Sequence, residues 1–275
     1  MDHARQPVEP SAELYAELLD VALAAAEGAG ALLDQGRPEH LTVAATKTSA
    51  VDVVTEMDIA AEQLIVRLLA ERRPHDSILG EEGAAAEGTS GVRWTVDPLD
   101  GTVNYLYGLP SWCVSIAADV DGVPTIGVVE IPARGERMHA VRGAGAFLDG
   151  RPLQVRPAPP MDRALIATGF GYRPERRARQ AEVLNHLLPR VRDIRRGGSA
   201  AIDLCDVAAG RLDGYYERGL QPWDYAAGAL IAAEAGALVG GRAGTAPGPD
   251  LTLAAPAGLF EPLQEALDQL GAWRD

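Results

Sequence analysis

The stretch that decides the fold is WTVDPLDGTVN, residues 94–104. Its first residues are aromatic or β-branched, which favours a strand. Pro98 fixes φ and suits the second position of a turn, so we expect the strand to stop at Asp97. Asp97 and Asp100 then flank a tight turn that directs both carboxylates to one side and exposes the Leu99 carbonyl. The stretch therefore predicts a cluster of oxygen ligands.

The chemistry of this turn fits a metal ion beside a phosphate. Carboxylates and a carbonyl are hard oxygen ligands of the kind that magnesium prefers. Gly101 lets a ligand approach the backbone closely, and the amides that open a short helix there would face an anion. Thr102 adds a hydroxyl beside the metal. The competing interpretation is an ordinary polar turn with aspartate at favoured positions, and a D-x-x-D pattern alone favours that interpretation.

Composition narrows the class of protein and of partner. The chain has 275 residues, 47% hydrophobic and 23% charged, which suffices for one large domain or two compact subdomains. Its net charge of −14 argues against a nucleic acid or an anionic membrane as the main partner. A negatively charged substrate would need cations as a bridge, and a carboxylate-rich metal site would supply them.

The cysteines and the N-terminal residues indicate the cellular compartment. Cys113 and Cys205 lie in apolar contexts, so we expect buried thiols rather than a disulfide. Residues 1–10 lack the apolar core of a signal peptide, and no stretch reaches the roughly 18 uninterrupted apolar residues of a membrane span. These patterns predict a cytoplasmic protein.

The first half of the chain predicts two helices and a largely antiparallel sheet. Ser11 caps a helix through about residue 33, and Thr55 opens a helix that stops before Pro74, with Asp58 completing a capping box. Asp-Gly pairs at 121–122 and 149–150 lie between apolar runs and indicate hairpins. We expect strands at 77–79, 94–97, 113–118, 125–131, 137–141, 146–148 and 153–155, and a loop at 83–91.

The Pro-rich segment 156–160 predicts a boundary between an N-terminal subdomain, 1–156, and a C-terminal subdomain, 157–275. Beyond it, strands alternate with helices. We expect strands at 165–168, 191–195, 213–217, 238–239 and 251–254, and helices at 175–188, 199–209, 222–235 and from about 258 onward.

Further acids lie at the ends of predicted elements. Glu81 follows the strand directly upstream of the one that carries Asp97, and adjacent strand ends would bring the two side chains together. Asp224 begins an apolar helix. The alternatives are a solvated acidic loop for Glu81 and a capping or helix-dipole role for Asp224 and Asp58. Four such acids would repel one another without cations, whereas two or three magnesium ions would make them a phosphoryl-transfer site.

Residues 97–104 resemble the signature of the inositol monophosphatase family of magnesium-dependent, lithium-sensitive phosphatases. Residues 80–82 and 223–228 look like its upstream and C-terminal signatures, and residues 52–58 and 198–201 also fit. The resemblance runs from about residue 12 to residue 270, and 167–172 and 213–217 look most like actinobacterial members. It implies a homodimer with a layered α-β-α-β-α sandwich, like those of inositol monophosphatase and fructose-1,6-bisphosphatase.

The resemblance also implies a role for each matching residue. Two to three magnesium ions would be ligated by Glu81, Asp97, the Leu99 carbonyl, Asp100 and Asp224, with Asp58 near the most weakly held ion. Thr102 and Glu81 would orient and activate a metal-bound water for in-line attack on phosphorus, so the implied catalytic residues are Glu81, Thr102 and Asp58. Phosphate and substrate hydroxyls would be contacted by Asp100, Gly101, Thr102, Ala200, Glu217 and Asp224, and Lys47 would lie on a mobile loop over the metals.

By the same resemblance, the activity is hydrolysis of myo-inositol 1-phosphate to inositol and phosphate. Histidinol phosphate, fructose 1,6-bisphosphate and 3′-phosphoadenosine 5′-phosphate are alternative substrates, because relatives hydrolyse them. A non-catalytic regulatory protein on this fold is a third interpretation, but it has no physical need for clustered carboxylates. The arginine-rich segment 173–196 fits a solvated helix face, with phosphate steering or a subunit interface as alternatives.

Overall fold

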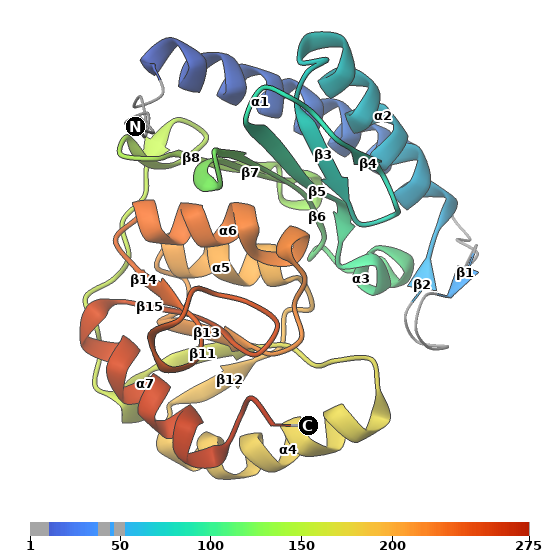
Figure 1. Cartoon of the computed structure of the whole chain (residues 1–275). Coiled ribbons are helices and arrows are strands. Elements are labelled where there is room, and N and C mark those ends of the chain that lie inside the picture. Colours follow the sequence, from blue (N-terminus) through green and yellow to red (C-terminus); the bar gives the residue numbers. More distant parts are fainter. Residues whose placement is uncertain (1–10, 38–44, 47–52, 275) are drawn as a thin grey trace, which may run out of the picture.

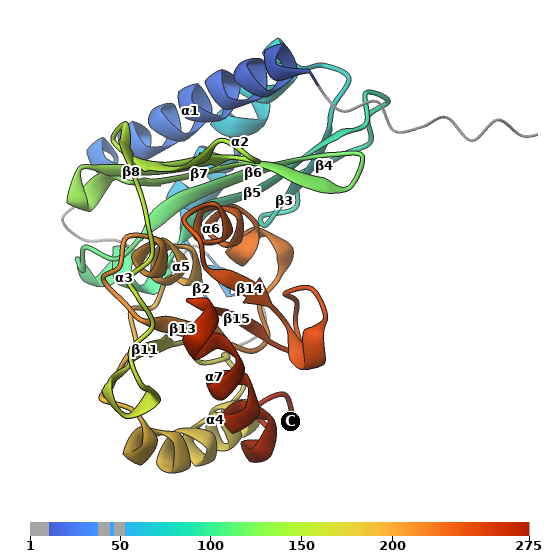
Figure 2. The ribbon, with the colours of Figure 1, turned by 90° about the vertical axis from the view of Figure 1, so that its left-hand side faces the viewer.

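The fold is a stack of alternating helical and sheet layers (Figures 1 and 2). The computed structural model describes residues 11–37, 45–46 and 53–274. Helices α1 (Ala12–Gln35) and α2 (Glu56–Arg72) cover one face of an eight-stranded sheet. Helices α5 (Ala200–Ala208) and α6 (Pro222–Glu234) lie between it and a five-stranded sheet, whose outer face carries α4 (Pro174–Leu187) and α7 (Ala257–Leu270). The predicted α-β-α-β-α sandwich is confirmed.

The larger sheet is largely antiparallel, as the hairpin signals predicted. Its strands are β3 (Ser77–Gly80), β4 (Ala85–Ala86), β5 (Val92–Asp100), β6 (Cys113–Val120), β7 (Val123–Ile131), β8 (Glu136–Val141), β9 (Gly145–Leu148) and β10 (Arg151–Pro152). They lie in the order β10-β9-β8-β7-β6-β5-β3-β4, in which β3 and β5 form a parallel pair. That pairing puts the end of β3 beside the middle of β5. A separate two-stranded sheet joins β1 (Ala45–Thr46) to β2 (Val53–Val54).

The smaller sheet mixes parallel and antiparallel pairs. Its strands are β11 (Leu165–Thr168), β12 (Asp193–Arg195), β13 (Gly214–Glu217), β14 (Leu238–Gly240) and β15 (Thr252–Ala255), in the order β12-β11-β13-β15-β14. Strand β11 runs parallel to both β12 and β13, and the remaining pairs are antiparallel. The carboxyl ends of three neighbouring strands therefore meet at one edge.

Strand β5 does not stop at Asp97, so that prediction is wrong. The strand continues to Asp100, with Asp97 opposite Ser115 and Asp100 opposite Cys113 on β6. Three steps on β5 thus match two on β6, which is a β-bulge. Residues three apart in a regular strand face opposite sides, and the extra residue returns Asp100 to the side of Asp97. Pro98 fits a bulge because it has no N–H to pair.

The second hairpin also differs in detail from its prediction. Pairing begins directly after the Asp149-Gly150 turn, whose positive φ angles of 47° and 77° suit a tight two-residue loop. Strand β10 is therefore Arg151–Pro152 rather than 153–155. Val155 instead donates its N–H to the Ala235 carbonyl at the end of α6. Strand β4 lies inside the predicted loop 83–91, because Ala85 and Ala86 pair with β3.

Short helices complete the connections. They are α3 (Thr102–Tyr107) and the single-turn η1 (Pro132–Arg134), η2 (Met161–Arg163), η3 (Leu188–Arg190) and η4 (Arg242–Gly244). Cys113 and Cys205 are free, buried thiols, as predicted. None of the helices in the described part of the chain has the length and apolar character that crossing a bilayer requires. The signal-peptide prediction falls on residues 1–10, outside the described residues, and the division at 156/157 stays a prediction.

Candidate active site

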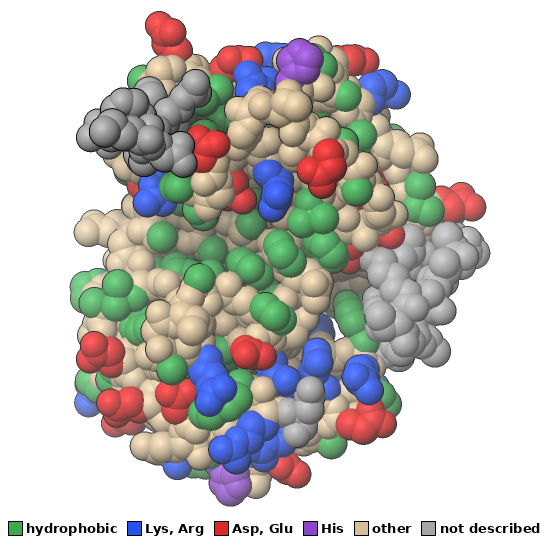
Figure 3. Space-filling view, in the orientation of Figure 1, with side chains coloured by type: hydrophobic (Ala, Val, Ile, Leu, Met, Phe, Trp, Pro, Cys, Tyr) green, Lys and Arg blue, Asp and Glu red, His purple; other side chains and the backbone are tan. Residues whose placement is uncertain are grey.

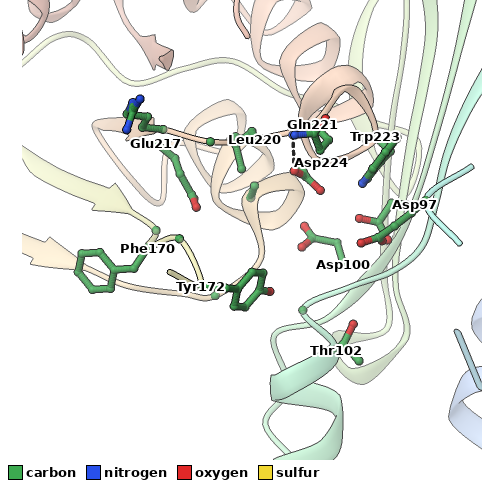
Figure 4. Close-up of a pocket in the computed structure, with 18 of the residues that line it drawn as sticks. Asp97, Asp100, Thr102, Phe170, Tyr172, Glu217, Leu220, Gln221, Trp223 and Asp224 are labelled. Carbon is green, nitrogen blue, oxygen red and sulfur yellow. Dashed lines mark hydrogen bonds between the residues drawn. The ribbon is translucent and has the colours of Figure 1, made fainter. Parts of the chain in front are cut away.

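One cavity of about 410 Å³ collects most of the predicted site residues (Figure 4). It lies where the ends of β3, β5, β11 and β13 meet the first turns of α3, α5 and α6. Its lining includes Glu81, Asp97, Leu99, Asp100, Gly101, Thr102, Ala200, Glu217 and Asp224. Asp58 lies behind Thr102, and Lys47 is outside the described residues, as is Asp52 of the 52–58 motif.

Asp97 is the most deeply buried acid of the cavity, with 1% of its surface exposed. Its Oδ1 accepts a hydrogen bond from the Leu99 N–H at 3.0 Å. Burial raises the pKa of Asp97 well above its usual range, and the charges of Glu81, Asp100 and Asp224 raise it further. Four carboxylates therefore lie close enough to raise one another's pKa. We call Glu81, Asp97, Asp100 and Asp224 the acidic floor.

Asp100 connects the bulge of β5 to helix α5. Its Oδ2 accepts hydrogen bonds from the Ser199 hydroxyl at 2.7 Å and from the Ala201 N–H at 2.9 Å. Burial raises the pKa of Asp100 to about 6, although these hydrogen bonds lower it. Ser199 also caps α5 by accepting the Ile202 N–H at 3.2 Å. Ser199, the N-cap of α5, thus fixes Asp100 at the end of β5.

Asp224 and Glu81 come to the floor from different elements, Asp224 from the first turn of α6 and Glu81 from the residue after β3. Asp224 accepts the Gln221 N–H at 2.6 Å, so the predicted capping role is correct, and the same carboxylate points toward Asp100 (Figure 4). Burial raises the pKa of Asp224 well above its usual range, followed by the charges of Asp100 and Glu81. Glu81 donates its N–H to the Val96 carbonyl at 3.2 Å, which continues the parallel pairing of β3 with β5. The end of β3 thus lies beside Val96, next to Asp97, although β5 itself continues to Asp100.

Thr102 and Asp58 form a pair beside the floor. The Thr102 Oγ1 lies 3.0 Å from Asp58 Oδ1 and 3.0 Å from the Leu99 carbonyl. The other oxygen of Asp58 accepts the Thr55 N–H at 2.8 Å, which is half of the predicted capping box. Burial raises the pKa of Asp58. At Gly101, φ is +90° and a Cβ would lie 2.7 Å from the Ser111 carbonyl, so this turn requires glycine.

The C-terminal half supplies the facing wall. Glu217, the last residue of β13, accepts the Tyr215 hydroxyl at 2.8 Å, and burial raises the pKa of Glu217 to about 7. Phe170 and Tyr172, on the segment after β11, lie on the same side of the cavity as Glu217 (Figure 4). Acids thus enter the cavity from both sheets, and two aromatic rings lie beside Glu217.

Comparison with known proteins decides the family. The model of the inositol monophosphatase family matches residues 14–272. The chain belongs to this family. It is 51% identical to Inositol-1-monophosphatase SuhB of Mycobacterium tuberculosis over 202 residues, 70% of each chain. It is 41% identical to Nus factor SuhB of Escherichia coli over 224 residues, 81% of this chain and 84% of the relative.

The solved structures agree with this assignment. Extragenic suppressor protein suhB from Bartonella henselae superposes with a TM-score of 0.86 at 36% identity, covering 92% of this chain and 98% of that one. The resemblance inferred from residues 97–104 is therefore confirmed, and so is the expectation of an enzyme: the chain is a phosphatase of a metal-dependent family.

Three residues of this phosphatase site were missed in the sequence. Ser199 holds Asp100, and Glu62 accepts the Glu82 N–H at 2.8 Å and the Ala84 N–H at 3.1 Å, which fixes the loop after Glu81. The Trp223 Nε1 is buried without a hydrogen-bond partner among the described residues and points into the cavity (Figure 4). The sequence could have indicated Glu62, because it lies one helical turn after Asp58 and therefore on the same face of the helix.

The donor set of the floor fits a hard divalent cation. The described His, Cys, Asp and Glu side chains contain no group of three already converged on one point. The aspartates of the floor use an oxygen each to accept hydrogen bonds from Leu99, from Ser199 and Ala201, or from Gln221, and Asp97 is also hydrogen-bonded to Glu81. Buried acids that repel one another are stabilised in their ionised form by a cation, and oxygen ligands select a hard one.

Proposed function

We propose that this phosphatase hydrolyses myo-inositol 1-phosphate to myo-inositol and phosphate with magnesium. The observation that carries the proposal is the convergence of the acidic floor and the Thr102–Asp58 pair in one cavity, faced by Glu217. The name of the mycobacterial relative supports the choice of inositol 1-phosphate. Histidinol phosphate, fructose 1,6-bisphosphate and 3′-phosphoadenosine 5′-phosphate remain the alternatives for the same chemistry.

Two to three magnesium ions would be held by Glu81, Asp97, the Leu99 carbonyl, Asp100 and Asp224. When bound, they would neutralise the acids and the phosphate and lower the pKa of a water. The Thr102 hydroxyl donates to Asp58, so its lone pairs are free to orient that water for in-line attack. The raised pKa of Asp58 suits it to receive a proton through Thr102, and Glu81 would help to orient the same water.

The remaining predicted residues would bind the substrate. The amides of Gly101 and Thr102 would hold phosphate oxygens, where α3 begins and its first N–H groups lack helical partners. Asp100, Glu217 and the start of α5 at Ala200 would contact the hydroxyls of the polyol. A carboxylate accepts hydrogen bonds from hydroxyls, so this wall suits a polyhydroxylated ring.

The proposal includes a homodimer in the cytoplasm that lithium inhibits. It includes no membrane or nucleic-acid partner, because the net charge is −14. The Escherichia coli relative is named a Nus factor, so binding of labelled RNA by this chain is worth measuring, and saturable binding at physiological salt would contradict that part of the proposal.

The experiment is a phosphate-release panel with the four candidate substrates, with and without magnesium. We expect release only with magnesium, and the highest kcat/KM for myo-inositol 1-phosphate. A higher value for histidinol phosphate or a nucleotide would replace the substrate and keep the mechanism. Absence of hydrolysis of every phosphomonoester with magnesium present would leave only the non-catalytic interpretation.

A further inference from the structure

The carboxylate of Glu217 lies against a glycine at the end of the neighbouring strand. Thr168 is opposite Tyr216 in the parallel pair of β11 and β13, so the next residues, Gly169 and Glu217, lie side by side. A Cβ added to Gly169 would lie less than 3.0 Å from the Oε1, the Oε2 and the Cδ of Glu217. The carboxylate therefore fills the space in which any other residue at position 169 would have its side chain.

The backbone of Gly169 does not itself require glycine. Its φ angle lies outside the left-handed region, unlike that of Gly101, so an L-residue can adopt this conformation. The three atoms nearest to an added Cβ all belong to Glu217. The position of the Glu217 carboxylate, rather than the fold of the chain, is thus what requires a glycine here.

Tyr215 orients the carboxylate once it lies against Gly169. Residues two apart in a strand face the same side, so Tyr215 and Glu217 project together from β13. The fully buried Tyr215 donates its hydroxyl to the Glu217 Oε2 at 2.8 Å. The side chain of Glu217 points into the cavity (Figure 4). One contact and one hydrogen bond together fix where Glu217 meets a substrate.

Helix α4 holds the segment that carries Gly169. The Oε1 of Gln180 accepts the Gly171 N–H at 2.9 Å, and its Nε2 donates to the Gly169 carbonyl at 3.4 Å. A side-chain amide both accepts and donates, so a single glutamine binds the two ends of this three-residue segment. Gln180 therefore sets where Gly169 lies relative to Glu217.

The same side of α4 also contacts the loop that follows Glu217. Arg176 lies four positions before Gln180 and packs across Gly171 and Gly219, where an added Cβ would lie 2.7 Å from its Cδ and 2.5 Å from its Nη1. The outer side of α4 carries exposed charged residues, and charged side chains gather at the lower end of the face in Figure 3, where α4 lies in Figure 1. The inner side of α4 thus holds both loops that flank the carboxylate.

We propose that Gly169 is a specificity-determining residue of this enzyme: it gives the Glu217 carboxylate the place from which it selects substrates with hydroxyl groups, and Gln180 holds Gly169 in that place. The proposal rests on the proposed function, in which Glu217 accepts hydrogen bonds from the polyol. Hydrogen bonds depend closely on distance and angle, so a displaced carboxylate loses them. Gly169 and Gln180 act through Glu217 and are positioning residues.

The test is Gly169→Ala, measured with myo-inositol 1-phosphate and with cyclohexyl phosphate, which has the same ring without hydroxyl groups. The added methyl group meets the flexible end of a glutamate side chain, so the variant should fold with the carboxylate displaced. We expect kcat/KM for myo-inositol 1-phosphate to fall about tenfold, mainly through a higher KM, which is the value of a hydrogen bond to a charged group. The value for cyclohexyl phosphate should change less than about twofold, because it makes no such hydrogen bond.

Equal falls for the two substrates, or no fall for either, would overturn the inference. If the parent does not turn over cyclohexyl phosphate, its inhibition constant against myo-inositol 1-phosphate replaces kcat/KM in the comparison. A parent enzyme that hydrolyses neither compound with magnesium present would overturn the proposed function instead.

A double-mutant cycle shows whether Gly169 acts through Glu217. Glu217→Ala removes the group that fills the space at Gly169, so adding Gly169→Ala should then change kcat/KM for myo-inositol 1-phosphate by less than about twofold. A further tenfold fall in that background would mean that Gly169 acts by another route, and would overturn the inference. If Glu217→Ala alone left the preference between the two substrates unchanged, the proposed contact of Glu217 with hydroxyl groups would fail.

Gln180→Met tests the same arrangement without adding atoms beside Glu217. It removes both hydrogen bonds to the segment 169–171, so the preference for myo-inositol 1-phosphate should fall about threefold. An unchanged preference would overturn the role assigned to Gln180. The controls are Asn185→Ala, on the exposed side of α4, and Gly248→Ala, where no atom of the described residues lies within 4 Å of the added Cβ. Both should keep the parent values, and an equal shift in either would overturn the inference.

Discussion

The acidic floor shares its cavity with Arg173, Arg176, Arg196 and Arg218, here called the arginine rim, but the two groups are held in different ways. The floor aspartates are tied by hydrogen bonds to the N–H groups of Leu99, Ala201 and Gln221. The rim arginines are exposed or half-buried: Arg196 and Arg218 follow strands β12 and β13, and Arg176 lies in helix α4. Backbone donors fix a carboxylate closely, which suits chemistry, whereas long side chains on loops adapt, which suits selection among substrates. Changes to the floor should therefore remove activity, and changes to the rim should redirect it.

The largest effect is expected from Asp97→Asn. The amide removes a charged ligand at the centre of the floor, so phosphate release should fall at least about 1,000-fold, in line with the several kcal/mol that metal ions contribute to such reactions. Because the substitution also removes a buried charge that its neighbours repel, the metal-free variant should unfold at a higher temperature than the parent.

The control for Asp97→Asn is Asp121→Asn, in a hairpin turn where φ is +50° and asparagine is well tolerated. Activity and unfolding temperature should both stay at the parent values. If Asp97→Asn retained magnesium-dependent turnover, the floor would not be the metal site, and the contrast with the rim would fail.

Ser199→Ala tests whether the floor depends on its supports. The variant loses both the hydrogen bond to Asp100 and the cap of α5, so kcat should fall about 10- to 100-fold, by analogy with the loss of partners that orient metal ligands. Loss of the cap alone should cost about 1 kcal/mol of stability. Ser199→Thr keeps the hydroxyl and should recover most of the activity.

Ser11→Ala separates the two roles of Ser199. Ser11 caps α1 by accepting the Leu14 N–H at 3.2 Å, far from the cavity. Its loss should cost similar stability, measured by denaturant unfolding, with unchanged kcat. Equal kcat in Ser199→Ala and the parent would show that Asp100 does not need this support.

The pH dependence of stability reflects the cost of burying ionised acids in the cavity. The pKa is raised from 3.8 to about 6 at Asp100 and from 4.5 to about 7 at Glu217, mainly by burial. Between about pH 4 and pH 7, the folded protein keeps protons that the unfolded chain has released. The free energy of unfolding without metal should therefore fall as the pH rises over this range, by roughly 1.4 kcal/mol or less per pKa unit.

Thermal unfolding in chelator at pH 5 and pH 8 checks this expectation. The unfolding temperature should be lower at pH 8, and magnesium should raise it more at pH 8 than at pH 5, because a cation binds the ionised acids. An unfolding temperature that rises with pH in chelator would contradict the raised pKa values of Asp100 and Glu217.

Local signals in the sequence accounted for much of the fold and for the acids of the floor. Hairpins and capping boxes depend on residues within a few positions, so Thr55 with Asp58 was predictable. The end of β5 was not predictable in this way. Pro98 favours a turn, but the chain pairs with β6 both before and after a bulge at this residue, so the strand continues. Tertiary pairing outweighed a local rule at that point.

Contacts between distant residues left no comparable signal. Ser199 and Asp100 are 99 positions apart, and nothing local links an N-cap to a strand bulge. The rim shows the same limit, since Arg218 lies outside the arginine-rich segment and joins it only through the order β12-β11-β13. Strand order is a property of the whole sheet, so composition within a window does not determine it.

The smallest effect is expected from Glu62→Gln. This variant tests a residue that holds the loop after Glu81 and is not itself proposed to bind metal. Glu62 has 7% of its surface exposed and holds the N–H groups of Glu82 and Ala84 from a distance of 20 and 22 positions. Glutamine retains one acceptor oxygen and loses the other, so the loop should stay closed but hold Glu81 less firmly. The magnesium concentration for half-maximal activity should rise about tenfold, the lower end of the range for residues that orient metal ligands, with kcat nearly unchanged.

Glu71→Gln, on the exposed side of the same helix, is the matched control and should leave the magnesium requirement unchanged. The measurement is a magnesium titration of phosphate release at saturating substrate. A fall in kcat without a change in the magnesium requirement would place Glu62 in the chemistry rather than behind Glu81. An unchanged titration would mean that the pairing of β3 with β5 is enough to position Glu81, through the hydrogen bond that the Glu81 N–H donates to the Val96 carbonyl. The floor would then depend on the sheet and not on helix α2.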